Sequence, residues 1–345
     1  MCCDSTVVAE IASHRRYLRQ PARACGSNPN ALTSFAPGIL PRPASKQTAI
    51  VNTYLQAART RDFCVSAEIF LKPESNATTI AAQAKLLKDH VDGVLLTDNQ
   101  FGQLHMSTLA AAALLIANGV DPIMQLSCRN RNRIALLSDL LGAGALGVTS
   151  LMLVKGNHVP DGFDPRPKAV LDLDATELIA TATRIRSDEG LPALSDFYVG
   201  GIVTAHRPEP DWTPRTLLRK VEAGAQFMMT NVCMDVSILR SWFRQLVAVK
   251  ILGRVDMIVS IAIPESADDA HWLRQNRPNF LIPDALIRRL EQSRDAQQEG
   301  VAIAAELLAD VAAIPGVSGV HLMATRNLAA IPAAIAESGT MRQTA

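Results

Sequence analysis

The sequence of 345 residues predicts an α/β fold: a (β/α)₈ TIM barrel that follows an irregular N-terminal extension. Eight short segments are almost wholly apolar, as buried parallel strands are. Segments with helical spacing of apolar residues lie between them, which is the alternation that a (β/α)₈ barrel requires. A doubly wound sheet is the alternative, but its first strand is normally followed by a glycine-rich turn. The first apolar segment here leads into Leu71-Lys72-Pro73, without glycine.

The eight expected strands share short length and an enrichment in branched and aromatic residues. They are expected at residues 63–70, 93–97, 122–126, 151–154, 197–203, 227–232, 256–263 and 319–323. The expected helices share apolar residues at three- and four-residue spacing. They are expected at residues 78–89, 106–117, 131–145, 175–187, 214–223, 237–252 and 283–290, with an extra helix at 299–312 before the last strand and a closing helix at 327–337.

Local signals support several of these boundaries. Asp174 stands immediately before the helix at 175–187, where a carboxylate can accept a hydrogen bond from the first-turn N–H groups. Pro214 falls in the first turn of another helix, where its missing N–H costs nothing. Gly147 and Gly224 follow expected helix ends, as glycine commonly does.

The chain divides into two unequal parts. Residues 1–45 are rich in Pro, Ser and Ala and lack sustained periodicity, so we expect a partly disordered extension with one short helix near residues 8–18. Residues 46–345 are expected to form the barrel domain. No second folded domain is indicated.

Composition narrows the function classes. Hydrophobic residues make up 48% of the chain and charged residues 19%, which is typical of a globular protein. A net charge of +1 gives no electrostatic reason to expect nucleic acid or an anionic membrane as a partner. Apolar runs are interrupted before membrane-spanning length. The six cysteines have neither zinc-site nor disulfide-framework spacing, so we expect no metal and a reducing cytoplasmic location.

Glu68 is the first candidate functional residue, because it interrupts the apolar run of the first expected strand. A buried carboxylate costs several kcal/mol unless it is paired, hydrogen-bonded or protonated. Burial would raise its pKa and suit it to general-acid chemistry near neutral pH. The alternative is a structural ion pair with a lysine at the barrel mouth. Position alone does not decide between the two.

The stretch from residue 121 to 157 holds further candidates after the third and fourth strands. Gln125 alternates with apolar neighbours and is expected to point into the barrel, whereas Cys128 is expected to pack. Arg129, Arg131 and Arg133 either clamp phosphates or are solvated on a helix surface. Lys155-Gly156-Asn157 supplies a positive charge beside a glycine that lets a planar ligand approach the backbone, although this is also a common turn.

The remaining candidates lie near other strands. Thr97-Asp98 follows the second strand, where Asp98 is expected to cap the next helix rather than bind ligand. His206 lies in the loop after the fifth strand, and Arg219-Lys220 on the following helix. Asn231, within the sixth strand, needs buried partners and is a plausible ligand contact. His321 in the last strand is equally compatible with a satisfied core histidine.

Several long segments carry a family resemblance in a fixed order between about residues 62 and 338. They read SAEIFLKPES, TDNQ, QLSCRNRNRIALLSDLLGAGALG, KAVLDLDATEL, RKVEAGAQFMMTNVCMD, RPNFLIPDALIRRLE, EGVAIAAELL and GVHLM. With these, the chain resembles the methylenetetrahydrofolate reductase family in its small, single-domain bacterial form. The N-terminal extension lies outside the resemblance.

The resemblance implies an oxidoreductase with a flavin, usually FAD with FMN as the alternative. NADH or NADPH reduces the flavin, which then converts methylenetetrahydrofolate to methyltetrahydrofolate, or the reverse in one-carbon catabolism. By position, Glu68 matches the family's general acid. The implied cofactor-binding residues are Thr97, Gln125, Lys155, Gly156, Asn157, His206, Arg219 and Lys220, and the implied substrate-binding residues are Asn157 and Asn231.

Three departures from the family pattern fall in the expected pocket. Gly156-Asn157 stands where the family usually has Gly-Asp, and Asn231 where a glutamine is usual. His206 lies in a loop that often reads Asn-Pro after a small residue. The alternative hypothesis is therefore a flavin-free or partner-dependent folate-binding homologue with altered substrate or lost reductase activity. A homo-oligomer and an electron-delivering partner subunit are both compatible with the resemblance.

Overall fold

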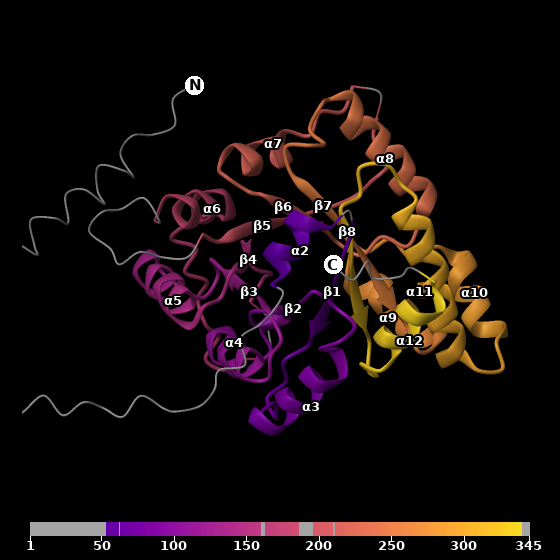
Figure 1. The fold of residues 1–345 in the computed structure, drawn as a ribbon, viewed down its shortest axis with the longest axis horizontal. Coiled ribbons are helices and arrows are strands. Elements are labelled where there is room, and N and C mark those ends of the chain that lie inside the picture. Colours follow the sequence, from indigo (N-terminus) through magenta and orange to yellow (C-terminus); the bar gives the residue numbers. More distant parts are fainter. Residues whose placement is uncertain (1–52, 62, 160–162, 186–195, 210, 340–345) are drawn as a thin grey trace, which may run out of the picture. The chain divides into compact units, whose positions relative to one another are not determined.

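Eight parallel strands close into a barrel in the order β1 to β8, with helices outside it, in the computed structural model of the chain (Figure 1). The structure describes residues 53–61, 63–159, 163–185, 196–209 and 211–339. The predicted TIM barrel is thereby confirmed. The expected extension at 1–45, including its short helix, lies outside the described residues, and its boundary stays a prediction. No helix of the described part is long and apolar enough to span a membrane.

The strands agree with the expected ranges to within two residues at each end. They are β1 Cys64–Ile69, β2 Gly93–Leu96, β3 Pro122–Ser127, β4 Ser150–Val154, β5 Tyr198–Val203, β6 Phe227–Thr230, β7 Asp256–Ile263 and β8 Gly319–Ala324. Apolar runs in the sequence are the features that predict these strands best. The strands are buried on both faces, because helices cover the outside of the barrel and side chains fill its inside.

All nine expected helices are present. They are α3 Ala77–Leu87, α4 Thr108–Ala117, α5 Arg133–Leu146, α6 Ala175–Arg184, α7 Arg215–Glu222, α8 Val236–Ala248, α10 Asp284–Gln292, α11 Ala296–Ala312 and α12 Ala330–Glu337. The structure adds three unexpected elements, α2 Tyr54–Thr60, the 3₁₀ turn η2 Gln100–Gly102 and α9 Ala267–Asn276. Asp174 caps α6 as expected, by accepting hydrogen bonds from Thr176 and Glu177 N–H groups.

Helix α2 closes the N-terminal end of the barrel (Figure 1). Its Tyr54 is fully buried, with its ring centroid 5.9 Å from that of Tyr198 and 6.0 Å from that of Phe227. The last two lie at the starts of β5 and β6, so the three aromatic rings fill the same layer of the lumen. A Cβ at Gly200 would lie 2.2 Å from the Phe227 ring, so a glycine is required there to admit the ring.

Alternate residues of each strand face the lumen, and those near the carboxyl end of β1 are polar. Cys64 belongs to the apolar cluster of the lumen, and Ser66 and Glu68 follow on the same face of β1 at two-residue spacing. Strand β8 pairs with β1 in register, so that His321 lies directly opposite Ser66. The lumen is therefore apolar near α2 and polar toward the carboxyl ends of the strands, where TIM barrels carry their ligand sites.

The carboxyl group of Asp121 gives a prediction for stability against pH. Burial raises its pKa to about 7, although Tyr54 N–H and the Thr149 hydroxyl donate hydrogen bonds to it. Because this pKa lies above the unfolded value of about 3.9, the stabilising contribution is complete below pH 4 and is lost as pH rises through 7. We expect Asp121→Asn to raise the free energy of unfolding by about 1–3 kcal/mol at pH 8 and to leave it unchanged near pH 4.

Urea unfolding of both proteins across this pH range measures the effect. Asp310→Asn is the matched control, because that carboxylate is exposed in an ion pair with Arg240. The control is expected to follow the wild-type curve. A parallel pH dependence of Asp121→Asn and wild type would contradict the assignment.

Candidate active site

A chain of three polar side chains lies inside the barrel, between β1 and β8. Ser66 Oγ lies 3.1 Å from His321 Nδ1, and His321 Nε2 lies 3.5 Å from Glu68 Oε2. Glu68 is 8% exposed and His321 is 2% exposed. The other carboxyl oxygen, Glu68 Oε1, is buried without a hydrogen-bond partner among the described residues. Glu68 therefore holds one oxygen beside an imidazole and leaves the other for a group that enters from the mouth.

Glu68 lies beside a histidine, His321, and not in the ion pair with a lysine that the sequence offered as an alternative. The structure places the His321 imidazole 3.5 Å from Glu68, and the Arg277 guanidinium interacts electrostatically with Glu68. Burial lowers the pKa of the Arg277 guanidinium to about 10, and the negative charge of Glu68 opposes that shift. Sequence analysis left the role of His321 open and did not consider Ser66 or Arg277. The β1–β8 register could not be read from the sequence, and it is what brings Ser66 to His321.

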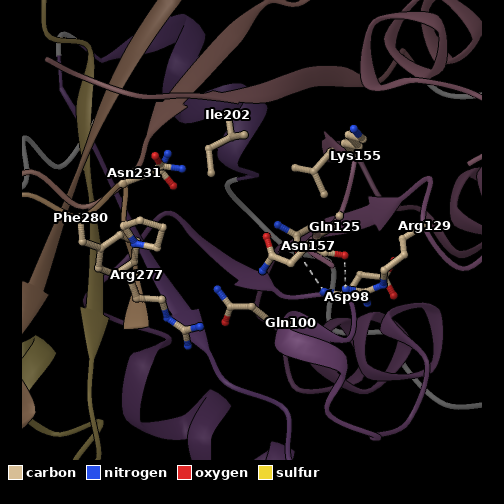
Figure 2. A pocket seen from close by; sticks show the side chains of 14 residues that line it. Asp98, Gln100, Gln125, Arg129, Lys155, Asn157, Ile202, Asn231, Arg277 and Phe280 are labelled. Carbon is tan, nitrogen blue, oxygen red and sulfur yellow. Dashed lines mark hydrogen bonds between the residues drawn. The ribbon is translucent and has the colours of Figure 1, made fainter. Parts of the chain in front are cut away.

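A first cavity of about 280 Å³ opens at the carboxyl ends of β2 to β6 (Figure 2). Its wall combines Asp98 and Gln125, the turn at Gly156, Asn231 and the segment Arg277–Phe280. The segment follows α9, which the sequence did not predict, so its contribution was missed. Arg277 joins this cavity to the Glu68 site, because it lines the first and feels the charge of the second.

Hydrogen bonds fix the part of the first cavity wall that lies at the carboxyl ends of β2 and β3. Gln125 Oε1 accepts from Asp98 N at 2.8 Å, and Asp98 Oδ2 accepts from Ser127 N at 2.8 Å. Arg131 donates to both carboxylate oxygens of Asp98, at 2.6 and 3.1 Å. Asp98 therefore braces the strand ends, and the expectation that it caps the next helix is wrong, since Ser107 caps α4.

The turn after β4 requires a glycine. Gly156 has φ +90°, and a Cβ there would lie 2.8 Å from Arg129 Cβ. Lys155 and Asn157 are exposed on either side and line the first cavity (Figure 2). The glycine is therefore required because the turn packs closely on Arg129, and the close approach of a planar ligand to this backbone stays a prediction.

A second cavity of about 450 Å³ lies between the loop after β5 and helix α7. It borders the first cavity, because Ile202, Asn231 and Asn279 line both. Lys220 lines it as a buried cation whose Nζ donates to the Ile202 carbonyl at 2.6 Å, and burial lowers the pKa of the ammonium. His206 lines it with its ring 4.7 Å from the Trp212 ring in an edge-on contact.

The structure brings together most of the residues expected at the site. Gln125, Lys155, Gly156, Asn157 and Asn231 line the first cavity, and His206, Lys220 and Asn231 line the second. Three candidates line neither cavity. Glu68 is buried beside His321 and interacts electrostatically with Arg277, which lines the first cavity. Thr97 is buried at the end of β2, away from both cavity walls. Arg219 is exposed on α7, with its guanidinium 3.9 Å from Asp174.

The three arginines after β3 have different surroundings. Arg131 is paired with Asp98 and Asp139, and Arg133 with Asp172, so neither is the phosphate clamp that the sequence allowed. Arg129 is 3% exposed and lines the first cavity. Cys128 is fully buried, and burial raises the pKa of its thiol to about 12, which agrees with packing. In the described ranges, no His, Cys, Asp and Glu side chains form a group able to hold a metal ion.

A comparison with known protein families shows to which family the chain belongs. The family described as methylenetetrahydrofolate reductase matches residues 53–339, which is most of the chain and the whole described barrel. The chain belongs to the methylenetetrahydrofolate reductase family. The resemblance deduced from sequence segments is thereby confirmed. No curated protein matches the chain.

Solved structures add evidence on the fold. The barrel is similar to an uncharacterized protein from Clostridium thermocellum that binds two copies of 5-methyl-5,6,7,8-tetrahydrofolic acid, at 12% identity and a TM-score of 0.60. That alignment covers 82% of this chain and 97% of the other. A 2,3-dimethylmalate lyase of the PEP mutase/isocitrate lyase superfamily matches at 12% identity, with 76% and 75% of the two chains covered and a TM-score of 0.41. The first of these structures, with a TM-score of 0.60, supports a shared fold.

Proposed function

We propose that this member of the methylenetetrahydrofolate reductase family is a flavin-dependent oxidoreductase that interconverts methylenetetrahydrofolate and methyltetrahydrofolate. NADH or NADPH is the proposed hydride source. The observation that carries the proposal is Glu68: a buried carboxyl group with one oxygen unpartnered among the described residues, held beside His321 toward the carboxyl ends of the strands, and linked to the first cavity through Arg277.

The residues of the two cavities fit a flavin. The backbone of the turn at Gly156 forms part of the wall of the first cavity and packs closely on Arg129. The adjoining cavities extend from the ends of β2 and β3 to Lys220, which suits a long cofactor with a charged tail. FAD is proposed rather than FMN, because the second cavity offers room beyond the first. When bound, the flavin supplies the two-electron hydride chemistry that the protein's own side chains lack.

Glu68 performs proton transfer in this proposal. Opening the five-membered ring of methylenetetrahydrofolate leaves an amine that must gain a proton, and a neutral carboxylic acid can donate it. Ser66 lies against Nδ1 of His321, and Nε2 of His321 lies 3.5 Å from one oxygen of Glu68, which leaves the other oxygen without a partner among the described residues. We propose that this second oxygen serves the substrate. Asn231 and Asn157 are the proposed amide contacts to the pterin ring, since both line the first cavity and can donate and accept hydrogen bonds.

The test begins with the absorption spectrum of the purified full-length protein, with and without added FAD. A flavin spectrum, NADH oxidation coupled to a quinone acceptor, and formation of methyltetrahydrofolate from methylenetetrahydrofolate are expected. A colourless protein that takes up neither FAD nor FMN would refute the proposal.

A flavin-free or partner-dependent folate-binding protein is the second candidate, and the position of Arg219 favours it. This proposed cofactor residue lies outside both cavities, and its neighbour Lys220 is already bonded to a backbone carbonyl. Calorimetric titration with methyltetrahydrofolate separates the candidates, because tight binding by flavin-free protein supports the second. Turnover with an artificial dye but not with NADH or NADPH would point to an electron-delivering partner subunit.

A further inference from the structure

Arg129 is a buried cation whose hydrogen bonds all go to uncharged groups. Its guanidinium donates to the Asn99 carbonyl at 2.7 Å, to the Asn157 carbonyl at 3.2 Å and to Asn130 Oδ1 at 2.8 Å. The residue is only 3% exposed and lines the first cavity (Figure 2). Burying a cation beside dipoles rather than a carboxylate costs free energy, and such groups are concentrated at functional sites.

The negative charge of Asp98 acts on Arg129, but Asp98 makes no direct hydrogen bond to it. Asp98 gives both of its oxygens to Arg131, and one of them also accepts from Ser127 N–H. Arg131 also pairs with Asp139, so the charge of Asp98 is shared between Arg131 and Arg129. Lys155 and Arg277 add two further positive charges to the cavity wall. Asn157, which also lines this wall, contributes an amide and no negative charge.

The position of Arg129 is fixed by the fold. Its three acceptors come from the loop after β2, the turn after β4 and its own loop after β3. The Gly156 turn also packs against its Cβ. The charge therefore cannot withdraw to solvent as a surface arginine does, and it acts on whatever occupies the cavity through a medium of low dielectric constant.

We propose that Arg129 tunes the bound flavin, by stabilising the negatively charged reduced ring over the neutral oxidised ring. This inference rests on the proposed function. A fixed cation binds the form that carries more negative charge more tightly, and the affinity ratio of the two forms sets the reduction potential. Reduction of the flavin by nicotinamide becomes easier, and passage of the hydride on to folate becomes less favourable by the same factor.

The test compares flavin affinities in the oxidised and reduced states, measured by fluorescence titration and by equilibration with a reference dye. We expect Arg129→Gln to lower the ratio of reduced to oxidised affinity about tenfold, which equals roughly 30 mV for a two-electron couple. Arg129→Lys keeps the charge and loses the forked hydrogen bonds, and is expected to stay within about threefold of wild type. A shift of Arg129→Lys as large as that of Arg129→Gln would overturn the proposal, because geometry rather than charge would then be responsible.

Two further variants keep the test decisive. Arg133→Gln is the matched control, since Arg133 lies four residues along the chain, outside the cavity, and pairs with Asp172; no shift is expected. Lys155→Gln changes an exposed side chain of the same cavity, and a shift of about threefold in the direction of Arg129→Gln is expected. If Arg129→Gln fails to fold in a thermal melt, an unchanged ratio in Lys155→Gln overturns the proposal.

The outcomes separate this inference from the proposed function. If the wild-type protein binds no flavin, both the proposed function and the role of Arg129 are refuted. A wild-type protein that binds flavin and reduces folate, with an affinity ratio that Arg129→Gln leaves within twofold, would remove only the role of Arg129.

Discussion

Replacement of Glu68 by glutamine is expected to slow hydride transfer to the folate by about 10²- to 10⁴-fold, the usual contribution of a general acid. Reduction of the flavin by NADH should stay within about twofold, because that half-reaction needs no proton from this side chain. The substitution keeps the size of the side chain and its contact with His321, but it removes the acidic proton. Stopped-flow measurement of flavin bleaching and recovery follows the two half-reactions separately.

Two variants make the result interpretable. Glu74→Gln, at an exposed position in the loop that follows β1, controls for loss of a carboxylate in the same segment and should behave as wild type. His321→Gln tests the group that holds Glu68, and we expect a smaller loss in the folate half-reaction together with a displaced pH profile. Equal losses in both half-reactions for Glu68→Gln would show that the side chain holds the cofactor site together rather than transferring a proton.

Truncation of Tyr54 to alanine is expected to lower the free energy of unfolding by about 3–5 kcal/mol, the usual cost of deleting a buried aromatic ring. The ring is fully buried and contacts the rings of Tyr198 and Phe227. Urea unfolding followed by circular dichroism measures the change, and a fall in melting temperature of roughly 6–20 °C should accompany it.

The control for Tyr54 retains the ring. Tyr54→Phe preserves both aromatic contacts and removes only the hydroxyl group, so its stability should remain within about 1 kcal/mol of wild type. A loss below about 1 kcal/mol for Tyr54→Ala would mean that helix α2 is dispensable for the barrel. Flavin uptake should be unchanged in both variants at temperatures where they are folded, because α2 lies at the opposite end of the lumen from the site.

The barrel could be predicted because its strands leave a physical trace in the sequence. Each strand is covered by helices outside and side chains inside, so it reads as an unbroken apolar run such as 256–263. Helix α9 left no such trace: its exposed face dominates, and its buried residues are few, with Asp269 among them. Helix α2 has only seven residues, and what fixes it is a tertiary contact of Tyr54 with distant strands.

The site was predictable where one residue broke a local rule. Glu68 stood out as a charge inside an apolar strand, and Gly156 as a glycine directly after one. Arg277 could not be found in this way, because a charged residue in a polar segment is unremarkable until the fold places it over the lumen. The roles of Asp98 and Arg131 were misjudged for the same reason: each looks like a surface residue, and their pairing links positions that only the β2–β3 register brings together.

Helix α2, the short helix before β1, determines how many N-terminal residues can be deleted from this protein. Thr53 begins α2 with reciprocal hydrogen bonds to Gln56, and the match to the family also begins at residue 53. A fragment that starts at the first strand, as apolar periodicity alone would suggest, leaves Tyr198 and Phe227 facing water at the open base of the barrel. We therefore expect the folding unit to begin at Thr53, because a deletion that extends past residue 52 removes the cap of α2 and then the Tyr54 ring that contacts Tyr198 and Phe227.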